Sequence, residues 1–205
     1  MQMASFVRTP VVAIACLAPV LASAQSDVEI AYGIRIGGPL SVPECPKMLR
    51  GGAFVMYERS PMPCVKADAP TAAPGDFTRG GMIVFPFNQR PAQSSWDSVG
   101  LVMHEGRVGA LVVGTFGHAV QSTIFDDLVA KYGKPVESAM LPVQNAMGAK
   151  YESIVAQWEV GTVHVQFFGI SGKLNQGLLL IGTKDGLAER QARIDRVLKS
   201  TRTPL

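Results

Sequence analysis

Apolar and polar residues alternate with a period of two over several segments of this chain, and that period is typical of half-buried β-strands. The segments 98–104 and 108–114 are apolar runs joined across Glu105-Gly106. A two-residue connection with glycine in the second position indicates a β-hairpin. A compact apolar run at 82–85 precedes them and predicts a neighbouring strand.

A second hairpin is predicted further along the chain. Residues 154–160 and 163–167 each alternate, and they are separated by Gly161-Thr162. We expect this hairpin to have one buried face. The later run 178–181 is apolar throughout, and we therefore expect it to lie in the middle of the sheet.

Between the two predicted hairpins lies the clearest helix pattern in the chain. Apolar residues recur at i, i+3, i+4 and i+7, namely at Phe125, Leu128, Val129 and Tyr132. We expect Ser122 or Thr123 to cap the start of this helix, with Asp126 and Asp127 in its first turn. Gly133 is placed to end it in a left-handed conformation.

A second helix is predicted near the end of the chain, at 187–199. The order of strands, helix, strands and helix predicts an α+β fold, an antiparallel sheet with two helices packed on one face. A parallel arrangement would need a helix between most strands, and the predicted hairpins leave no room for one.

The first half of the chain is less regular. Residues 28–36 alternate loosely and predict a strand, which Gly37-Gly38 would end. Residues 45–79 are rich in proline, glycine and alanine, so we expect a loop-rich N-terminal region.

The beginning of the chain reads as a secretory signal peptide over residues 1–24. Arg8 precedes an apolar run that ends at Ala22-Ser23-Ala24, and small residues at these positions favour cleavage after Ala24, before Gln25. The run is too short for a membrane span. Lipid attachment at Cys16 is the alternative to cleavage. We therefore expect a single exported domain at 25–205, periplasmic or secreted, with no membrane span.

Removal of the signal peptide would leave two cysteines, Cys45 and Cys64. An even pair in an exported chain predicts a disulfide, which would staple the loop-rich region. The alternative, a redox or metal pair, lacks a C-x-x-C spacing and a nearby histidine. The formal net charge of +3 is too small to indicate nucleic acid as a partner.

Catalytic and metal-binding patterns are weak in this sequence. The three histidines, His104, His118 and His164, fall in different predicted elements without ligand spacing. The adjacent carboxylates Asp126 and Asp127 are explained by the helix dipole. We therefore expect a protein that is not an enzyme and that needs no metal or other cofactor.

Two features favour binding. A loop after the predicted strand 82–85 combines aromatic, amide and guanidinium groups, a mixture found at interfaces; its residues are Phe87, Asn88, Gln89 and Arg90, with Trp96 nearby. The edge of an antiparallel sheet can also accept a partner strand. The sequence therefore predicts a non-enzymatic binding or adaptor protein that acts on an envelope protein. The alternative is a small-molecule or lipid carrier with a pocket between sheet and helices, lined by the chain's many methionines and phenylalanines.

The chain also resembles a group of uncharacterised exported proteobacterial proteins. The residues that carry this resemblance are the stretch 125–135, then Asn145, Gly148, Trp158 and Gly177, and earlier the segments 37–40 and 43–46. The helix that ends in Lys-Tyr-Gly-x-Pro before a hairpin is similar to small periplasmic modules of the β-lactamase-inhibitor-protein type, a general design that outer-membrane assembly lipoproteins share. Neither resemblance implies a functional residue.

Overall fold

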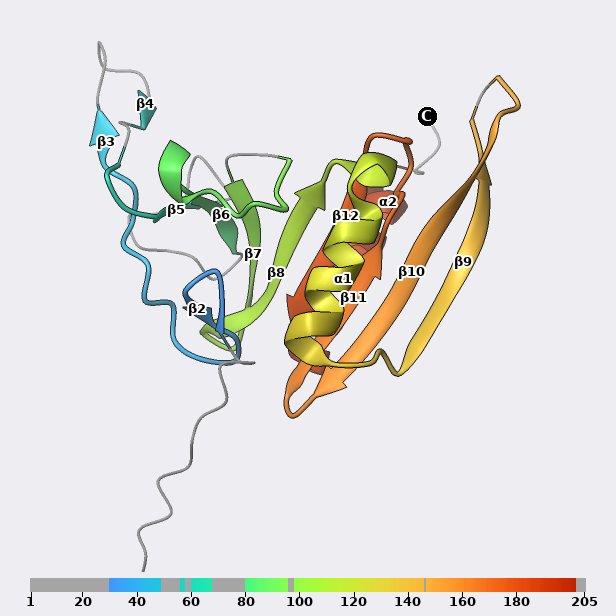
Figure 1. Cartoon of the computed structure of the whole chain (residues 1–205). Helices are drawn as coiled ribbons and strands as arrows, with labels where there is room; N and C mark the ends of the chain where they lie inside the picture. The colour runs from blue at the N-terminus through green and yellow to red at the C-terminus, as the bar shows by residue number, and fades with distance from the viewer. Residues whose placement is uncertain are drawn as a thin grey trace, which may run out of the picture.

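The computed structural model describes residues 30–48, 56–57, 60–67, 80–95, 98–145 and 147–201. Its centre is an eight-stranded antiparallel sheet (Figure 1). The strands, from one edge to the other, are β5 (Cys64–Ala67), β6 (Gly81–Val84), β7 (Ser98–His104), β8 (Arg107–Thr115), β12 (Gly177–Gly182), β11 (Val163–Phe168), β10 (Lys150–Val160) and β9 (Glu137–Gln144). The predicted α+β class is thereby confirmed.

Two helices pack on this sheet, α1 (Gln121–Tyr132) and α2 (Lys184–Thr201). They lie on opposite faces, with α1 in front of the sheet and α2 behind it in Figure 1. Leu179 and Ile181 belong to the core that α1 covers, whereas Leu180 lies beside α2. Successive residues of a strand point to opposite faces, so the expectation that both helices share one face is wrong. Central strands that are apolar on both faces need a cover on each.

The first predicted hairpin is confirmed as the pair β7–β8. Its two turn residues both have positive φ, 48° at Glu105 and 73° at Gly106. Positive φ at both central positions is the requirement of a type I′ turn, whose twist matches that of the strands. The second hairpin is confirmed as β10–β11, and the apolar strand β12 lies between β8 and β11, as expected of a central strand.

The boundaries of α1 differ from the prediction. The helix begins at Gln121 after Val120, whose side chain makes no capping hydrogen bond, and its first turn contains no acidic residue. Ser122, Thr123 and the two aspartates therefore lie within the helix. Gly133 does end it, with φ of 80° and its N–H bonded to Val129 O at 2.9 Å.

The strand expected at 28–36 is a small hairpin instead, formed by β1 (Ile30–Ala31) and β2 (Ile34–Arg35); residues 28 and 29 lie outside the described residues. The chain reverses at Tyr32 and Gly33, both of which have positive φ. Ala31, Ile34 and Ile36 are buried in the core that α1 covers. The remaining short elements are β3 (Lys47–Met48), β4 (Met56–Tyr57), η2 (Phe87–Gln89) and η3 (Gly117–Ala119).

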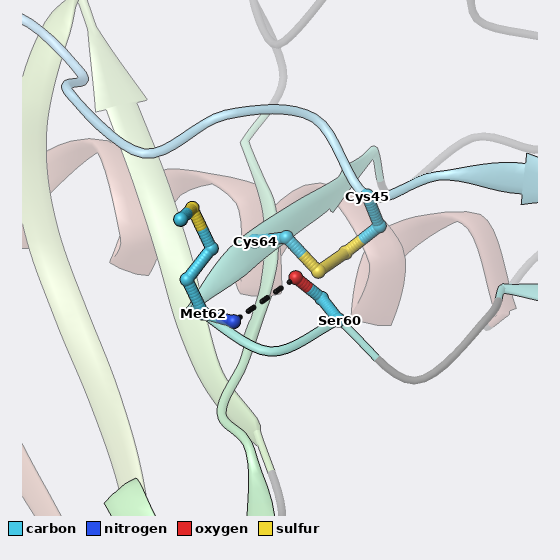
Figure 2. The surroundings of a disulfide bond; sticks show 4 residues. All are labelled: Cys45, Ser60, Met62 and Cys64. Atoms are coloured by element: carbon cyan, nitrogen blue, oxygen red, sulfur yellow. Dashed lines mark hydrogen bonds between the residues drawn. A yellow bond between two sulfur atoms is a disulfide. The ribbon is translucent and has the colours of Figure 1, made fainter.

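The predicted disulfide joins Cys45 to Cys64, with Cα atoms 4.7 Å apart (Figure 2). It holds the segment 43–45 against the outer edge of β5. There Val65 N donates to Pro43 O at 2.8 Å, and Val65 O accepts from Cys45 N at 2.9 Å. At this edge of the sheet, the outward backbone groups of Val65 are thus paired with a covalently fixed loop.

Candidate functional site

The loop predicted to bind a partner forms the short helix η2, which lies at the β5 side of the sheet. Asn88, Gln89 and Arg90 are exposed. Phe85, directly before the loop, is buried and anchors it. The side chain of Phe87 and the whole of Trp96 lie outside the described residues.

A second loop lies beside η2. Gln89 Nε2 donates to Pro61 O at 3.5 Å, which connects η2 to the turn that precedes Cys64. In that turn Met62 N donates to Ser60 Oγ (Figure 2), and the Met62 side chain is 55% exposed. We call the exposed residues Pro61, Met62, Asn88, Gln89 and Arg90 the η2–disulfide surface. Methionine and arginine are enriched at protein interfaces, and here they are presented by loops that a disulfide and the sheet hold in place.

A groove of about 480 Å³ separates α2 from the neighbouring strands β10 and β11. Its lining is mixed: the polar residues are Gln157, Glu159, His164, Gln166, Lys184, Arg190 and Gln191, and the apolar residues are Trp158, Val165, Leu180, Leu187 and Ala188. Glu159 and His164 face each other across the strand pair, with Glu159 Oε1 3.5 Å from His164 Nδ1. Burial lowers the pKa of Arg190. The groove therefore offers amide, carboxylate, imidazole and cationic groups to a polar ligand.

Helix α2 forms one wall of this groove, and it is held to the sheet at two places along its length. At the start, the Thr183 hydroxyl accepts from Gly186 N at 3.0 Å, a typical N-cap bond. A Cβ on Gly186 would overlap the backbone of Gly109, so glycine allows the helix to approach β8 closely.

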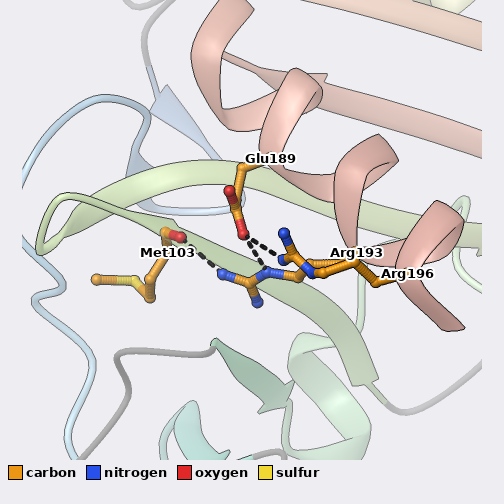
Figure 3. Close-up of polar contacts among 4 residues, drawn as sticks. All are labelled: Met103, Glu189, Arg193 and Arg196. Atoms are coloured by element: carbon orange, nitrogen blue, oxygen red, sulfur yellow. Dashed lines mark hydrogen bonds and ion pairs between the residues drawn. The ribbon is translucent and has the colours of Figure 1, made fainter.

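Further along α2, a cluster of charged groups holds the helix to β7 (Figure 3). Arg193 Nη2 donates to Met103 O at 3.0 Å. Glu189 Oε1 accepts from Arg193 Nε at 2.9 Å and from Arg196 Nη2 at 3.1 Å, and these hydrogen bonds lower the pKa of the Glu189 carboxyl. Arg193 therefore joins α2 to β7 rather than extending into solvent.

A small cavity of about 150 Å³ lies between α1, β12 and the β1–β2 turn. Ile124, Leu128 and Tyr132 of the helix line it, and Tyr32 lies on the other side. The buried Tyr132 hydroxyl has no hydrogen-bond partner among the described residues. Burial raises the pKa of this hydroxyl to about 12.

Replacing Tyr132 with phenylalanine is expected to leave the free energy of unfolding unchanged or raise it by up to about 1 kcal/mol, because the variant no longer buries an unpaired hydroxyl. The wild type should also lose stability as the pH rises from about 10 to about 12, since only the unfolded tyrosine ionises in that range. The Tyr132→Phe variant should lose less stability over the same pH range. Urea titrations at pH 8 and pH 11 test both statements, and a loss above 1 kcal/mol at pH 8 would contradict them.

The titratable residues considered in the sequence lie apart. His118 packs its ring edge-on against Tyr151, and His104 lies at the end of β7, away from the groove that contains His164. Asp126 and Asp127 are exposed on α1. Within the described part of the chain, no three histidine, cysteine, aspartate or glutamate residues gather at one point.

The edge of the sheet opposite to the disulfide is formed by β9, which the sequence pattern did not reveal. Along β9 all side chains except Val143 are exposed. The exposed residues include two large apolar side chains, Met140 at 54% and Leu141 at 48%. Pro142 lies within the strand, and proline in a strand is a signal of a sheet edge.

Comparison with protein-family models, with curated proteins and with solved structures finds no match. The resemblance to exported proteobacterial proteins therefore stays a prediction. In the described part of the chain, neither helix is long and apolar enough to cross a membrane.

Proposed function

We propose that this protein is an exported, non-enzymatic binding or adaptor protein that contacts an envelope protein through the η2–disulfide surface. The observation that carries the proposal is the presentation of Met62, Gln89 and Arg90 on two adjoining loops. Because the disulfide fixes the base of one loop, binding orders little of the chain, and the entropic cost of association is reduced.

Two features of the chain support its location in an oxidising compartment. The pattern at residues 1–24 fits a secretory signal, and the Cys45–Cys64 bond is of a kind that persists outside the reducing cytoplasm. Both features support a periplasmic or secreted location.

The test is crosslinking in intact cells with a tagged chain, followed by mass spectrometry. We expect one dominant protein partner, and we expect at least a tenfold loss of that partner in the double variant Gln89→Ala with Arg90→Ala. A matched control is Lys199→Ala, an exposed substitution on α2. A partner recovered equally with both variants would overturn the assignment of the surface.

The second candidate function is a carrier of a polar small molecule, and the polar groove beside α2 favours it. The many polar groups among its lining residues suit a polar molecule better than the acyl chain of a lipid. Native mass spectrometry of the exported protein would then show a bound mass that is lost in the variant Gln166→Ala.

Turnover of a compound by the protein, abolished in His164→Ala, would instead overturn the non-enzymatic assignment, because His164 and Glu159 form the carboxylate–imidazole pair of this groove.

A further inference from the structure

The strand β9 has a partner on one side. It pairs with β10 over its whole length, and none of the described strands lies along its outer edge. An open, apolar edge strand is a site for pairing with another strand. The question is which strand fits it.

The directions of the backbone groups follow from the register. Asn145 N donates to Ala149 O, and this pair continues the register in which Val143 lies opposite Tyr151. Hydrogen-bonded pairs alternate along an antiparallel ladder. The odd positions from 137 to 145 therefore bond to β10, and the even positions direct their N–H and C=O groups outward.

Pro142 is one of the outward positions. Its missing N–H therefore removes no hydrogen bond to β10, which explains why the strand tolerates it. The outward donors are then Ser138, Met140 and Gln144. The outward acceptors are the carbonyls of these residues and of Pro142.

The side chains of residues 137–145 are arranged symmetrically about Leu141. Two polar residues at each end enclose five apolar residues, in the order Glu137, Ser138, Ala139, Met140, Leu141, Pro142, Val143, Gln144 and Asn145. The strand read backwards therefore has the same polarity pattern as the strand read forwards. Such a pattern is complementary to an antiparallel copy of itself.

We propose that β9 pairs antiparallel with β9 of a second copy of this chain, across a two-fold axis at Leu141. Ala139 then lies opposite Val143 of the second copy, and Met140 lies opposite Pro142. The outward groups form roughly six backbone hydrogen bonds, two for each Ser138–Gln144 pair and one for each Met140–Pro142 pair.

Registers shifted toward the start of β9 match less well. Centring the axis on position 140 places the Glu137 carboxylate opposite Val143, and centring it on Ala139 places that carboxylate opposite Leu141. In the register centred on Leu141, Glu137 lies opposite the amide of Asn145. Glu137 is the only charged residue of β9, and the two copies of it lie at opposite ends, so like charges do not meet.

Disulfide trapping tests the register. In the proposed dimer the two copies of position 141 form a non-hydrogen-bonded pair with Cα atoms about 4.5 Å apart, which a disulfide can bridge. The two copies of position 139 are about 14 Å apart. We expect Leu141→Cys, purified after export and mildly oxidised, to run as a covalent dimer on a non-reducing gel. The matched variant Ala139→Cys, on the same face of the strand, should stay monomeric there. Equal trapping of both variants would overturn the register.

Charged substitutions at position 141 test the dimer itself, with sedimentation equilibrium as the measurement. The wild type should dimerise, whereas Leu141→Lys and Leu141→Glu should each associate at least tenfold more weakly, because like charges then meet on the axis. A mixture of the two variants should recover the dimer. Leu141 is half exposed, so both variants are expected to fold, and circular dichroism checks this. A wild type that stays monomeric, or variants that dimerise as well as the wild type, would overturn the proposal.

Discussion

Replacing Cys45 and Cys64 together with serine is expected to lower the free energy of unfolding by about 3 kcal/mol. The bond joins residues 19 positions apart, and closing a loop of about this length restricts the unfolded chain by that amount in the chain-entropy model. The folded state should lose a second contribution, because without the covalent bond the backbone hydrogen bonds to Val65 hold the segment 43–45 to β5 less firmly.

Urea titration of the double serine variant measures this loss. Reduction of the wild type before the titration should give the same value within about 1 kcal/mol, since both treatments remove the same bond. Hydrogen exchange should also show faster exchange of the Val65 amide in the variant, because that amide bonds to the stapled segment. An unchanged free energy of unfolding would mean that the loop restricts little of the unfolded chain.

Replacing Gln121 with leucine is expected to lower the free energy of unfolding by about 2–4 kcal/mol. The side chain, 5% exposed, fills the place where β11 diverges from β10. Its Nε2 donates to Glu152 O at 2.8 Å, and its Oε1 accepts from Ile154 N at 2.9 Å. Leucine has a similar volume and a good helix propensity, but it would leave two buried backbone groups unpaired, each at a cost of about 1–3 kcal/mol.

The matched control for this prediction is Gln191→Leu. Gln191 is exposed on α2 and bonds to Asp195 one turn away, so we expect a change within about 0.5 kcal/mol. Urea titrations, analysed with one common dependence of the free energy of unfolding on urea concentration, compare the stabilities of the two variants. Faster amide exchange at Ile154 in the Gln121 variant would identify the lost hydrogen bond as the cause, whereas equal losses in both variants would contradict this account.

The parts of the fold that the sequence predicted are those with local signals. The β7–β8 turn has a glycine at a position of positive φ, and the end of α1 has Gly133 in the same role. Each of these two signals depends on a few neighbouring residues, and each is therefore readable without the rest of the chain. The disulfide followed instead from counting the cysteines that remain after residues 1–24 are removed.

The features that escaped prediction depend on distant residues. The polar contacts of Gln121 lie about thirty positions away in β10, so nothing near Gln121 marks it as a buried amide. The face that each helix covers was also undetermined, because an apolar stripe shows that a helix is buried but does not show on which side of a sheet. β9 was missed because a strand exposed on both faces has no alternation to detect.

The candidate site was predicted in part. The sequence indicated an exposed loop at Asn88, Gln89 and Arg90, and these residues are exposed. The exposed Met62 beside them was not foreseen, because the contact between Gln89 and Pro61 spans 28 positions. The polar groove beside α2 escaped for the same reason, since residues of a strand pair and of a distant helix form it together.

The covered edge at β5 also has a consequence for assembly size. A unit that can pair at one edge only stops growing once that edge is filled, whereas a unit with two open edges can add further copies without limit. In the proposed dimer β9 is filled, and at the other edge the segment 43–45 pairs with Val65 beside the Cys45–Cys64 bond. The disulfide therefore helps to limit the assembly to two copies, because its loss would weaken the segment that blocks strand addition at β5.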